Sequence, residues 1–176
     1  GRFADPHDPI KGIEFDGRIA EDFKLSSGTW VHVGALRVKA IAAGVPLIQD
    51  CVVTGHDREE VGLLVFPNPA GCRSLCPDAP ADLPLSSLIA LPPVHHALAQ
   101  ALARMAAESS GSSTCPTRAL MLEEPPSIDA NEITDKGYIN QRAVLLRRAG
   151  EVERLYAPRP DCDIVLAARS AECERG

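Results

Sequence analysis

The sequence predicts an α+β domain: a small, mostly antiparallel central sheet with an N-terminal β-hairpin and flanking helices. Two nearly continuous apolar runs, residues 47–54 and 61–66, lie on either side of a polar turn. They indicate a pair of buried antiparallel strands at the centre of the sheet. Three longer stretches, residues 34–43, 92–105 and 140–157, carry apolar residues at helical spacing. A sheet with helices packed on it accounts for both patterns.

The composition indicates one domain and excludes several function classes. The chain has 176 residues, of which 45% are apolar, so one domain with an aliphatic core is expected. The net charge of −6 argues against a nucleic-acid partner, which needs a basic surface. No apolar run reaches the roughly 20 residues of a membrane span, and the polar start does not resemble a signal peptide. We therefore expect no membrane contact and a cytoplasmic location.

The six cysteines do not form a metal-binding pattern. Cys72 and Cys76 are the closest pair, and neither a second tight pair nor a His-x₃-His partner accompanies them. We therefore predict no metal site. Cys51 lies in an apolar run and is expected in the core. Without an export signal, all six are expected to be reduced thiols.

The first thirty-three residues predict turns and short strands. Residues 1–10 contain two prolines flanked by aspartates and are expected to form a linker. The stretches 12–18 and 21–25 alternate apolar and polar residues, which predicts the two strands of the N-terminal hairpin. Gly28 ends the second strand, and residues 30–33 form a third short extended segment.

The middle of the chain predicts one irregular segment, one long helix and one strand. Residues 67–92 carry six prolines, which predicts an irregular insertion with at most one short helix. A helix begins at Pro92 and ends at the Ser/Gly-rich residues 109–113. Residues 118–122 are a further buried strand, and an acidic, proline-containing loop follows at 123–131.

The last third of the chain predicts one helix and a tail. Residues 140–157 are expected to form a single amphipathic helix. Four charged residues of this helix are expected to face water: Arg147, Arg148, Glu151 and Arg154. Residues 158–176 form a polar tail, with a short helix or strand within 164–168.

A single lysine lies in the stretch 132–142, just ahead of this helix. The chain has four lysines against fourteen arginines, and Lys136 is the only lysine after Lys39. A compact ammonium on a flexible stem suits contact with a phosphate or a carboxylate. The alternative is an ordinary solvent-exposed loop lysine, and the residue type leaves both interpretations open.

The sequence contains no complete catalytic motif of its own. It lacks a Gly-x-Ser-x-Gly elbow, a Walker loop and a dinucleotide-binding fingerprint. None of the five histidines is spaced with a cysteine or serine in a catalytic pattern: His7, His32, His56, His95 and His96. The chain is therefore not expected to hold a self-sufficient active site.

Two polar segments resemble, in the correct order, two motifs of one enzyme family. The first reads Phe-Asp-Gly-Arg-Ile-Ala-Glu-Asp-Phe-Lys-Leu from Phe15, with Gly28 following. The second reads Glu-Ile-Thr-Asp-Lys-Gly-Tyr-Ile-Asn-Gln-Arg-Ala-Val-Leu from Glu132, after a buried strand and a proline turn. They resemble the hinge and the catalytic-lysine loop of the adenylate-forming superfamily of acyl-CoA synthetases and peptide-synthetase adenylation domains. The sequences of both segments are most similar to the feruloyl-CoA synthetase branch, and the resemblance extends over about residues 10–157.

The resemblance implies the mobile C-terminal domain of a larger AMP-forming ligase. Residues 1–10 would be the linker from a missing N-terminal domain, residues 11–157 the mobile domain, and 158–176 a tail. Members of the family use ATP and Mg²⁺ to activate a carboxylic acid as an acyl-adenylate, and then transfer the acyl group to coenzyme A. The implied acid is a hydroxycinnamate such as ferulate. The implied partner is the N-terminal domain of the same enzyme, and this fragment is expected to be inactive alone.

The same resemblance implies roles for individual residues. Lys136 is implied as the catalytic lysine of adenylation. The implied hinge residues are Arg18, Ala20, Glu21 and Asp22. The residues implied to face the nucleotide or coenzyme A are Arg18, Lys24, Gly28 and Gly137.

The two segments depart from the general family pattern at two positions. The usual loop reads Thr-x-x-Gly-Lys, but here Tyr138 stands where the lysine is expected and Lys136 precedes the glycine. Ala20 stands where the hinge usually has Asp or Lys, so the pivot within Arg18–Asp22 is left open. The alternative function is a non-catalytic α+β module that binds a regulatory or protein partner.

Overall fold

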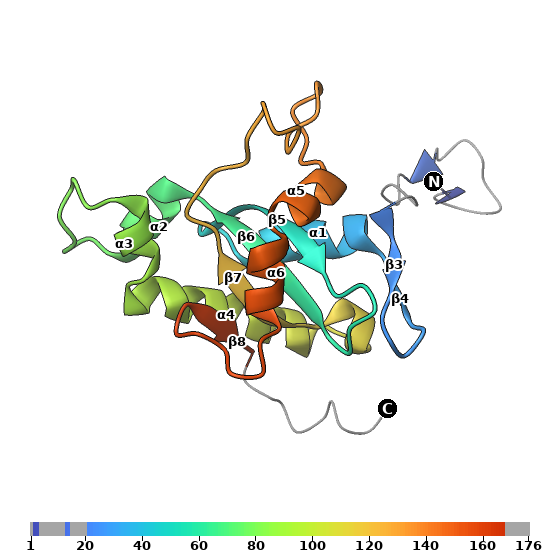
Figure 1. Ribbon diagram of the computed structural model, residues 1–176. Helices are drawn as coiled ribbons and strands as arrows, with labels where there is room; N and C mark the ends of the chain where they lie inside the picture. The colour runs from blue at the N-terminus through green and yellow to red at the C-terminus, as the bar shows by residue number, and fades with distance from the viewer. Residues whose placement is uncertain (1, 4–12, 15–20, 168–176) are drawn as a thin grey trace.

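The central sheet of the computed structural model, which describes residues 2–3, 13–14 and 21–167, has four strands in the order β5-β6-β7-β8 (Figure 1). These strands are β5 (Ile48–Thr54), β6 (Val61–Pro67), β7 (Pro116–Met121) and β8 (Ile164–Leu166). The β5–β6 and β7–β8 pairs are antiparallel, and the β6–β7 pair is parallel. The predicted α+β class and mostly antiparallel sheet are confirmed. Of the predicted central pair, β6 is interior but β5 lies at the edge.

Strand β6 is buried along its whole length because helices cover both faces of the sheet. Its sequence, Val-Gly-Leu-Leu-Val-Phe-Pro, sends alternate side chains into two separate cores. Leu63 packs with the helices α1 (Val33–Ala43) and α4 (Pro92–Ala107) on one face. Leu64 packs with the helices α5 (Gln141–Arg147) and α6 (Ala149–Leu155) on the other. Figure 1 shows α5 and α6 in front of the sheet, with α1 behind it.

The segment predicted to be irregular contains two short helices where at most one was expected. They are α2 (Pro69–Leu75) and α3 (Leu85–Ile89). The Asn68 side chain caps α2 by accepting hydrogen bonds from the amides of Ala70 and Gly71 at 3.0 and 3.3 Å. Proline at the first position of α2 has no amide to satisfy, so it starts this helix without cost. A short 3₁₀ turn, η3 (Ser112–Thr114), follows α4.

The single helix predicted over residues 140–157 is wrong in one respect, because the structure divides it into α5 and α6 at Arg148. Arg148 was expected to face water, but its residue is only 4% exposed. Its guanidinium turns inward to a buried carboxylate, Glu132. The backbone of Arg148 departs from helical geometry, with φ −103° and ψ 34°. A buried charge needs such a partner, which helical periodicity does not reveal.

Helix α5 is attached to the edge of the sheet by one glutamine. The Gln141 side chain accepts a hydrogen bond from the Val53 amide at 3.1 Å and donates one to the Val53 carbonyl. It therefore pairs with the backbone of edge strand β5 as a neighbouring strand would. Asn140 caps α5 by accepting from the Ala143 amide at 3.3 Å.

A hairpin lies near the N-terminal end, as predicted, but its strands differ from those expected. Strand β3 (Phe23–Lys24) pairs with β4 (Trp30–Val31), whereas β2 (Ile13–Glu14) pairs with β1 (Arg2–Phe3). The Ser26–Gly28 turn reverses the chain, so the next residues pair back onto β3. The rest of the predicted strand at 12–18 lies outside the described residues.

The described cysteines are free thiols. Cys51, Cys72, Cys76 and Cys115 are buried, and Cys162 is exposed. Burial raises the pKa of the Cys51 thiol to about 12 and that of Cys72 to about 11. Cys51 packs in the core as predicted. Cys173 lies outside the described residues.

The short segment predicted within residues 164–168 is strand β8, which joins this part of the tail to the main sheet. Within the described ranges, no helix combines the length and the apolar composition needed to cross a bilayer.

Candidate functional site

Lys136 lies at the tip of a tight hairpin, residues 134–138, which we call the lysine hairpin. The Thr134 amide donates to the Tyr138 carbonyl, and the Gly137 amide donates to the Thr134 carbonyl, both at 2.8 Å. Gly137 has φ +80°, a left-handed conformation that L side chains resist. A three-residue loop closed by a left-handed glycine is a standard hairpin connection. The turn leaves the Lys136 side chain exposed at its outermost point.

A fully buried carboxylate, Glu132, lies at the base of this hairpin. Arg148 donates to it through Nε at 2.8 Å and Nη2 at 3.1 Å, and Arg147 through Nη1 at 2.8 Å. The Ser127 amide adds a fourth hydrogen bond at 2.7 Å. Glu132 is thus an ionised group whose oxygens are satisfied by two cations and one backbone amide.

The surroundings of Glu132 keep it charged. Burial alone would raise its pKa, but the hydrogen bonds from Arg148, the Ser127 amide and Arg147 outweigh burial. The net effect lowers the pKa of Glu132 to about 2. The carboxylate is therefore ionised at neutral pH despite having no exposed surface.

The backbone of Glu132 continues the same network. Its amide donates to the Ser127 carbonyl at 2.9 Å, and its carbonyl accepts from the Asn140 amide at 2.8 Å. Ile133 and Ile139 form an antiparallel bridge above it. Both legs of the lysine hairpin therefore begin at residues that are hydrogen-bonded to the body of the domain.

Lys24 and Gly28 lie on the β3–β4 hairpin. Gly28 has φ +83° and donates its amide to the Leu25 carbonyl at 2.8 Å, which closes the turn. The Lys24 ammonium lies 5.0 Å from the centre of the Trp30 ring, a cation–π distance, and both side chains are exposed. Phe23 points the other way, into the core.

The predicted hinge is described only in part, since Arg18 and Ala20 lie outside the described residues. The Asp22 side chain is 9% exposed and accepts a hydrogen bond from the Val33 amide at 3.0 Å, and it bonds His32 Nδ1 at 2.9 Å. A carboxylate at the N-terminus of α1 complements the partial positive charge there. Asp22 therefore fastens the end of the hinge segment to the first helix. Glu21 is half-buried beside it.

The structure does not bring the two groups of predicted residues together. In Figure 1 the segment between β7 and α5, drawn in orange, projects above the sheet, whereas the blue β3–β4 hairpin lies at the right. The predicted residues thus lie on two separate candidate surfaces, one with Lys136 and Gly137 and one with Lys24 and Gly28.

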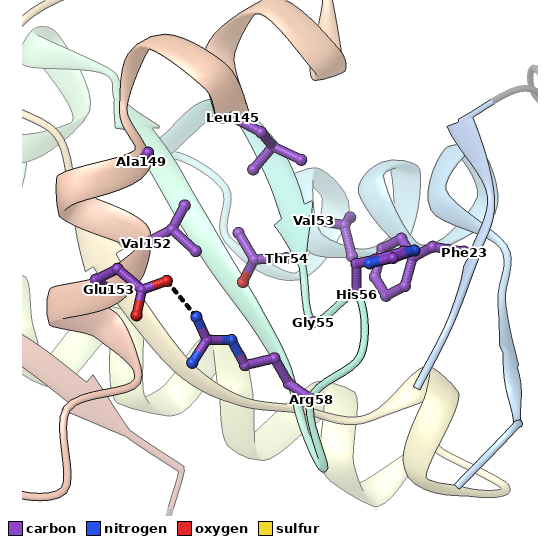
Figure 2. Close-up of a pocket in the computed structure, with 10 residues that line it drawn as sticks. All are labelled: Phe23, Val53, Thr54, Gly55, His56, Arg58, Leu145, Ala149, Val152 and Glu153. Atoms are coloured by element: carbon purple, nitrogen blue, oxygen red, sulfur yellow. Dashed lines mark hydrogen bonds and ion pairs between the residues drawn. The ribbon is translucent and has the colours of Figure 1, made fainter. Parts of the chain in front are cut away.

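Two hollows lie near these surfaces and were not predicted. One, of about 170 Å³, lies between the turn after β5 and the α5–α6 pair (Figure 2). Leu145 and Val152 face it from the helices, and the Phe23 and His56 rings lie on its other side. The ion pair of Arg58 with Glu153 crosses its rim. The other, of about 330 Å³, runs from Gly137 toward the start of α2. Neither could be read from the sequence, because the lining residues come from distant segments.

Within residues 2–3, 13–14 and 21–167, no group of three His, Cys, Asp or Glu side chains is placed to hold a metal ion.

Comparison with known proteins identifies the family. The family model described as "AMP-binding enzyme C-terminal domain" matches residues 32–159, whereas no curated protein sequence matches the chain. Three solved structures have a similar fold. The A domain of carboxylic acid reductase from Segniliparus rugosus, with AMP and a co-purified carboxylic acid, has a TM-score of 0.60 at 23% identity over 83% of this chain. The A-PCP didomain of that enzyme with AMP has a TM-score of 0.58 at 24% identity over 77%.

The third structure, the adenylation domain of the carboxylate reductase from Mycobacterium chelonae, has a TM-score of 0.60 at 20% identity over 83% of this chain. This chain spans 17% of the length of the didomain chain and 21% of each of the other two. The likeness at this identity is one of fold, whereas the family model matches most of the sequence. The chain belongs to the AMP-binding enzyme C-terminal domain family.

Proposed function

We propose that this chain is the mobile C-terminal domain of an ATP-dependent ligase that activates a carboxylic acid and transfers it to coenzyme A. The observation that supports it most is the lysine hairpin. Its exposed Lys136 makes no hydrogen bond or ion pair with another described residue, and its buried base is fully hydrogen-bonded. A cation at the exposed end of a hairpin whose base is hydrogen-bonded suits a domain that completes an active site elsewhere.

In the first half-reaction, a substrate carboxylate attacks the α-phosphate of ATP and releases pyrophosphate. Two anions must approach each other, so a cation placed between them lowers the barrier and orients the attack. We assign this role to the Lys136 ammonium. Mg²⁺ would accompany ATP in the N-terminal domain.

In the second half-reaction, a thiol must reach the acyl-adenylate, so Lys136 has to leave. Rotation of the domain about Arg18, Ala20, Glu21 and Asp22 would withdraw the lysine hairpin and present the β3–β4 hairpin. Gly28 lacks a side chain and leaves open space beside its Cα, which lets a narrow pantetheine arm pass. Arg18 and Lys24 would face the phosphates of coenzyme A, and Gly137 the nucleotide.

The acid we propose is a hydroxycinnamate such as ferulate. This choice rests on the resemblance of the two motif sequences to the feruloyl-CoA synthetase branch. The acceptor thiol is free coenzyme A in this proposal. Because one structure of similar fold is an A-PCP didomain, a carrier-bound thiol is the competing acceptor to be tested. Supplying the enzyme with ferulate, ATP and either thiol, and measuring thioester by mass spectrometry, distinguishes the two.

The proposal is tested first by measuring where adenylation occurs. The chain joined to its AMP-binding N-terminal domain should release pyrophosphate in the presence of ATP and a panel of carboxylic acids. The 176-residue chain alone should release none. Pyrophosphate release by the isolated chain, or none from the joined protein with any acid of the panel, would contradict the proposal.

A further inference from the structure

Glu132 and Arg148 are charged residues in the interior of the domain, where charge is costly. Glu132 is 0% and Arg148 4% exposed. Replacing a buried ion pair with apolar side chains is often neutral or stabilising, so stability alone gives no reason for charges here. Directional hydrogen bonds, by contrast, specify one arrangement of the segments that they join. The location of the pair beneath Lys136 therefore needs a functional explanation.

Glu132 joins three segments that are separate in the sequence. Its carboxylate binds the Ser127 amide in the acidic loop and the guanidinium groups of Arg147 and Arg148 at the α5–α6 junction. Its carbonyl binds the Asn140 amide, and Asn140 in turn caps α5. The loop before the hairpin, the hairpin itself and the helices after it are thus linked through one residue.

Arg148 extends this link to the sheet. Its Nη2 also donates to the Pro125 carbonyl at 3.1 Å, and its guanidinium lies 5.2 Å from the Phe66 ring centre on strand β6. Arg147, which is 41% exposed, bridges from Glu132 to Glu124 at the surface. Arg148 therefore fixes the orientation of the hairpin base relative to the central sheet.

The lysine hairpin itself has little support above this base. A single bridge, Ile133 to Ile139, and its own turn hydrogen bonds hold it together. Ile139 is buried, but the residues from Asp135 to Tyr138 are exposed. The direction in which Lys136 points relative to the domain is set where the two legs leave the core, at Glu132 and Asn140.

We propose that Glu132 is a positioning residue for Lys136: its buried carboxylate, held by Arg148 and Arg147, fixes the lysine hairpin in the direction that adenylation requires. This inference rests on the proposed function of Lys136. Glu132 touches no substrate, and it acts only through the lysine. A rigid base holds the ammonium in one position relative to the domain, so each rotation into the adenylation state returns it to the same place. A displacement of about 1 Å at such a position costs about 10²-fold in rate.

The test compares Glu132→Gln with Lys136→Ala and the double variant, in the chain joined to its AMP-binding domain. Glutamine keeps the shape and removes the charge. We expect Glu132→Gln to lower adenylation by about 10²-fold and to leave thioester formation from supplied acyl-adenylate unchanged. In the Lys136→Ala background, Glu132→Gln should cost almost nothing further, because its effect passes through the lysine.

Arg154→Ala is the matched control. Arg154 is also an arginine with two carboxylate partners, Asp161 and Asp163, but these lie outside the lysine hairpin. It should leave both half-reactions unchanged. Hydrogen exchange followed by mass spectrometry gives a readout independent of activity. Amides of residues 133–139 should exchange faster in Glu132→Gln and not in Arg154→Ala.

The outcomes separate this inference from the proposed function. If Lys136→Ala leaves adenylation intact, the proposed function fails. If Lys136→Ala abolishes adenylation but Glu132→Gln does not lower it, or lowers both half-reactions equally, the positioning role is wrong. If Glu132→Gln does not fold, Arg147→Gln decides by the same criteria, since Arg147 is half-exposed and reaches the same carboxylate.

Discussion

Two hairpins of this domain share one turn geometry but are attached to the domain by different kinds of contact. In residues 25–29 and in residues 134–138, the first amide donates to the last carbonyl, and a glycine amide donates to the first carbonyl. The glycines, Gly28 and Gly137, have φ values of +83° and +80°, and neither has an atom within 4 Å of where a Cβ would lie. Local turn chemistry therefore does not distinguish them.

What lies beneath the two turns does distinguish them. The β3–β4 hairpin is attached by apolar side chains, Phe23, Leu25 and Val31, buried in the larger core, and by backbone hydrogen bonds to the turn after β5. The lysine hairpin is attached chiefly by the ionised Glu132 and its arginines. Apolar contacts hold a segment in place without specifying its direction, whereas hydrogen-bonded charges specify direction at a cost in desolvation. The hairpin that we propose to aim a charge is the one whose base is a buried ionic cluster.

The largest expected effect comes from removing one partner of the ionic base. Arg148→Met leaves Glu132 buried with less compensation, so we expect the free energy of unfolding to fall by about 3–5 kcal/mol. The double variant Glu132→Met with Arg148→Met should recover most of this loss, because no buried charge remains. Urea unfolding of the three proteins measures both. A loss below about 1 kcal/mol in Arg148→Met would show that the pair is not truly buried.

Acid should weaken the ionic base of the lysine hairpin. The pKa of Glu132 is lowered to about 2 in the folded domain, from an ordinary value near 4.5. Its contribution to stability is therefore complete above about pH 4.5 and is lost as the pH falls through about 2, roughly 3 kcal/mol in all. The stability difference between the natural chain and Glu132→Gln, measured by urea unfolding, should shrink over that interval. A difference independent of pH would contradict the assignment.

A smaller and equal effect is expected at the two turns. Gly28→Ala and Gly137→Ala should each cost about 1–2 kcal/mol, because alanine resists positive φ even where space is open. Gly150→Ala is the control, since Gly150 lies in α6 without positive φ or a nearby atom. There alanine should stabilise the domain by up to about 1 kcal/mol. Thermal unfolding checks the sign, and a loss at all three positions would refute the conformational explanation.

Much of the fold followed from the sequence because its signals are local. The apolar runs at β5, β6 and β7 and the helical spacing of α1 and α4 placed these elements within a few residues of their observed ends. Lys136 was recognisable as an isolated lysine beside a glycine. The order of strands in the sheet, with β6 inside and β5 at the edge, depends on pairings between distant segments and was not recognisable.

The buried ion pair beneath the candidate site could not be predicted from the sequence, for a physical reason. Helical periodicity placed Arg148 on the water-facing side, and it gives no weight to a carboxylate sixteen positions earlier that pulls the guanidinium inward. Glu132 was quoted only as the first residue of the second motif, with no role of its own. The sequence shows two adjacent arginines, Arg147 and Arg148, but it does not show which of them is buried. Only the three-dimensional contacts reveal that Arg148 pairs with Glu132.

We propose that the two hairpins serve different half-reactions, and one measurement tests this directly. Lys136→Ala and Lys24→Ala are each assayed, in the chain joined to its AMP-binding domain, for acyl-adenylate formation and for thioester formation from supplied acyl-adenylate. Lys136→Ala should lower the first rate by about 10²–10³-fold and spare the second. Lys24→Ala should spare the first and lower the second by about tenfold, the loss of one charge-assisted hydrogen bond. If both variants lower the same half-reaction, the division of labour between the hairpins is contradicted.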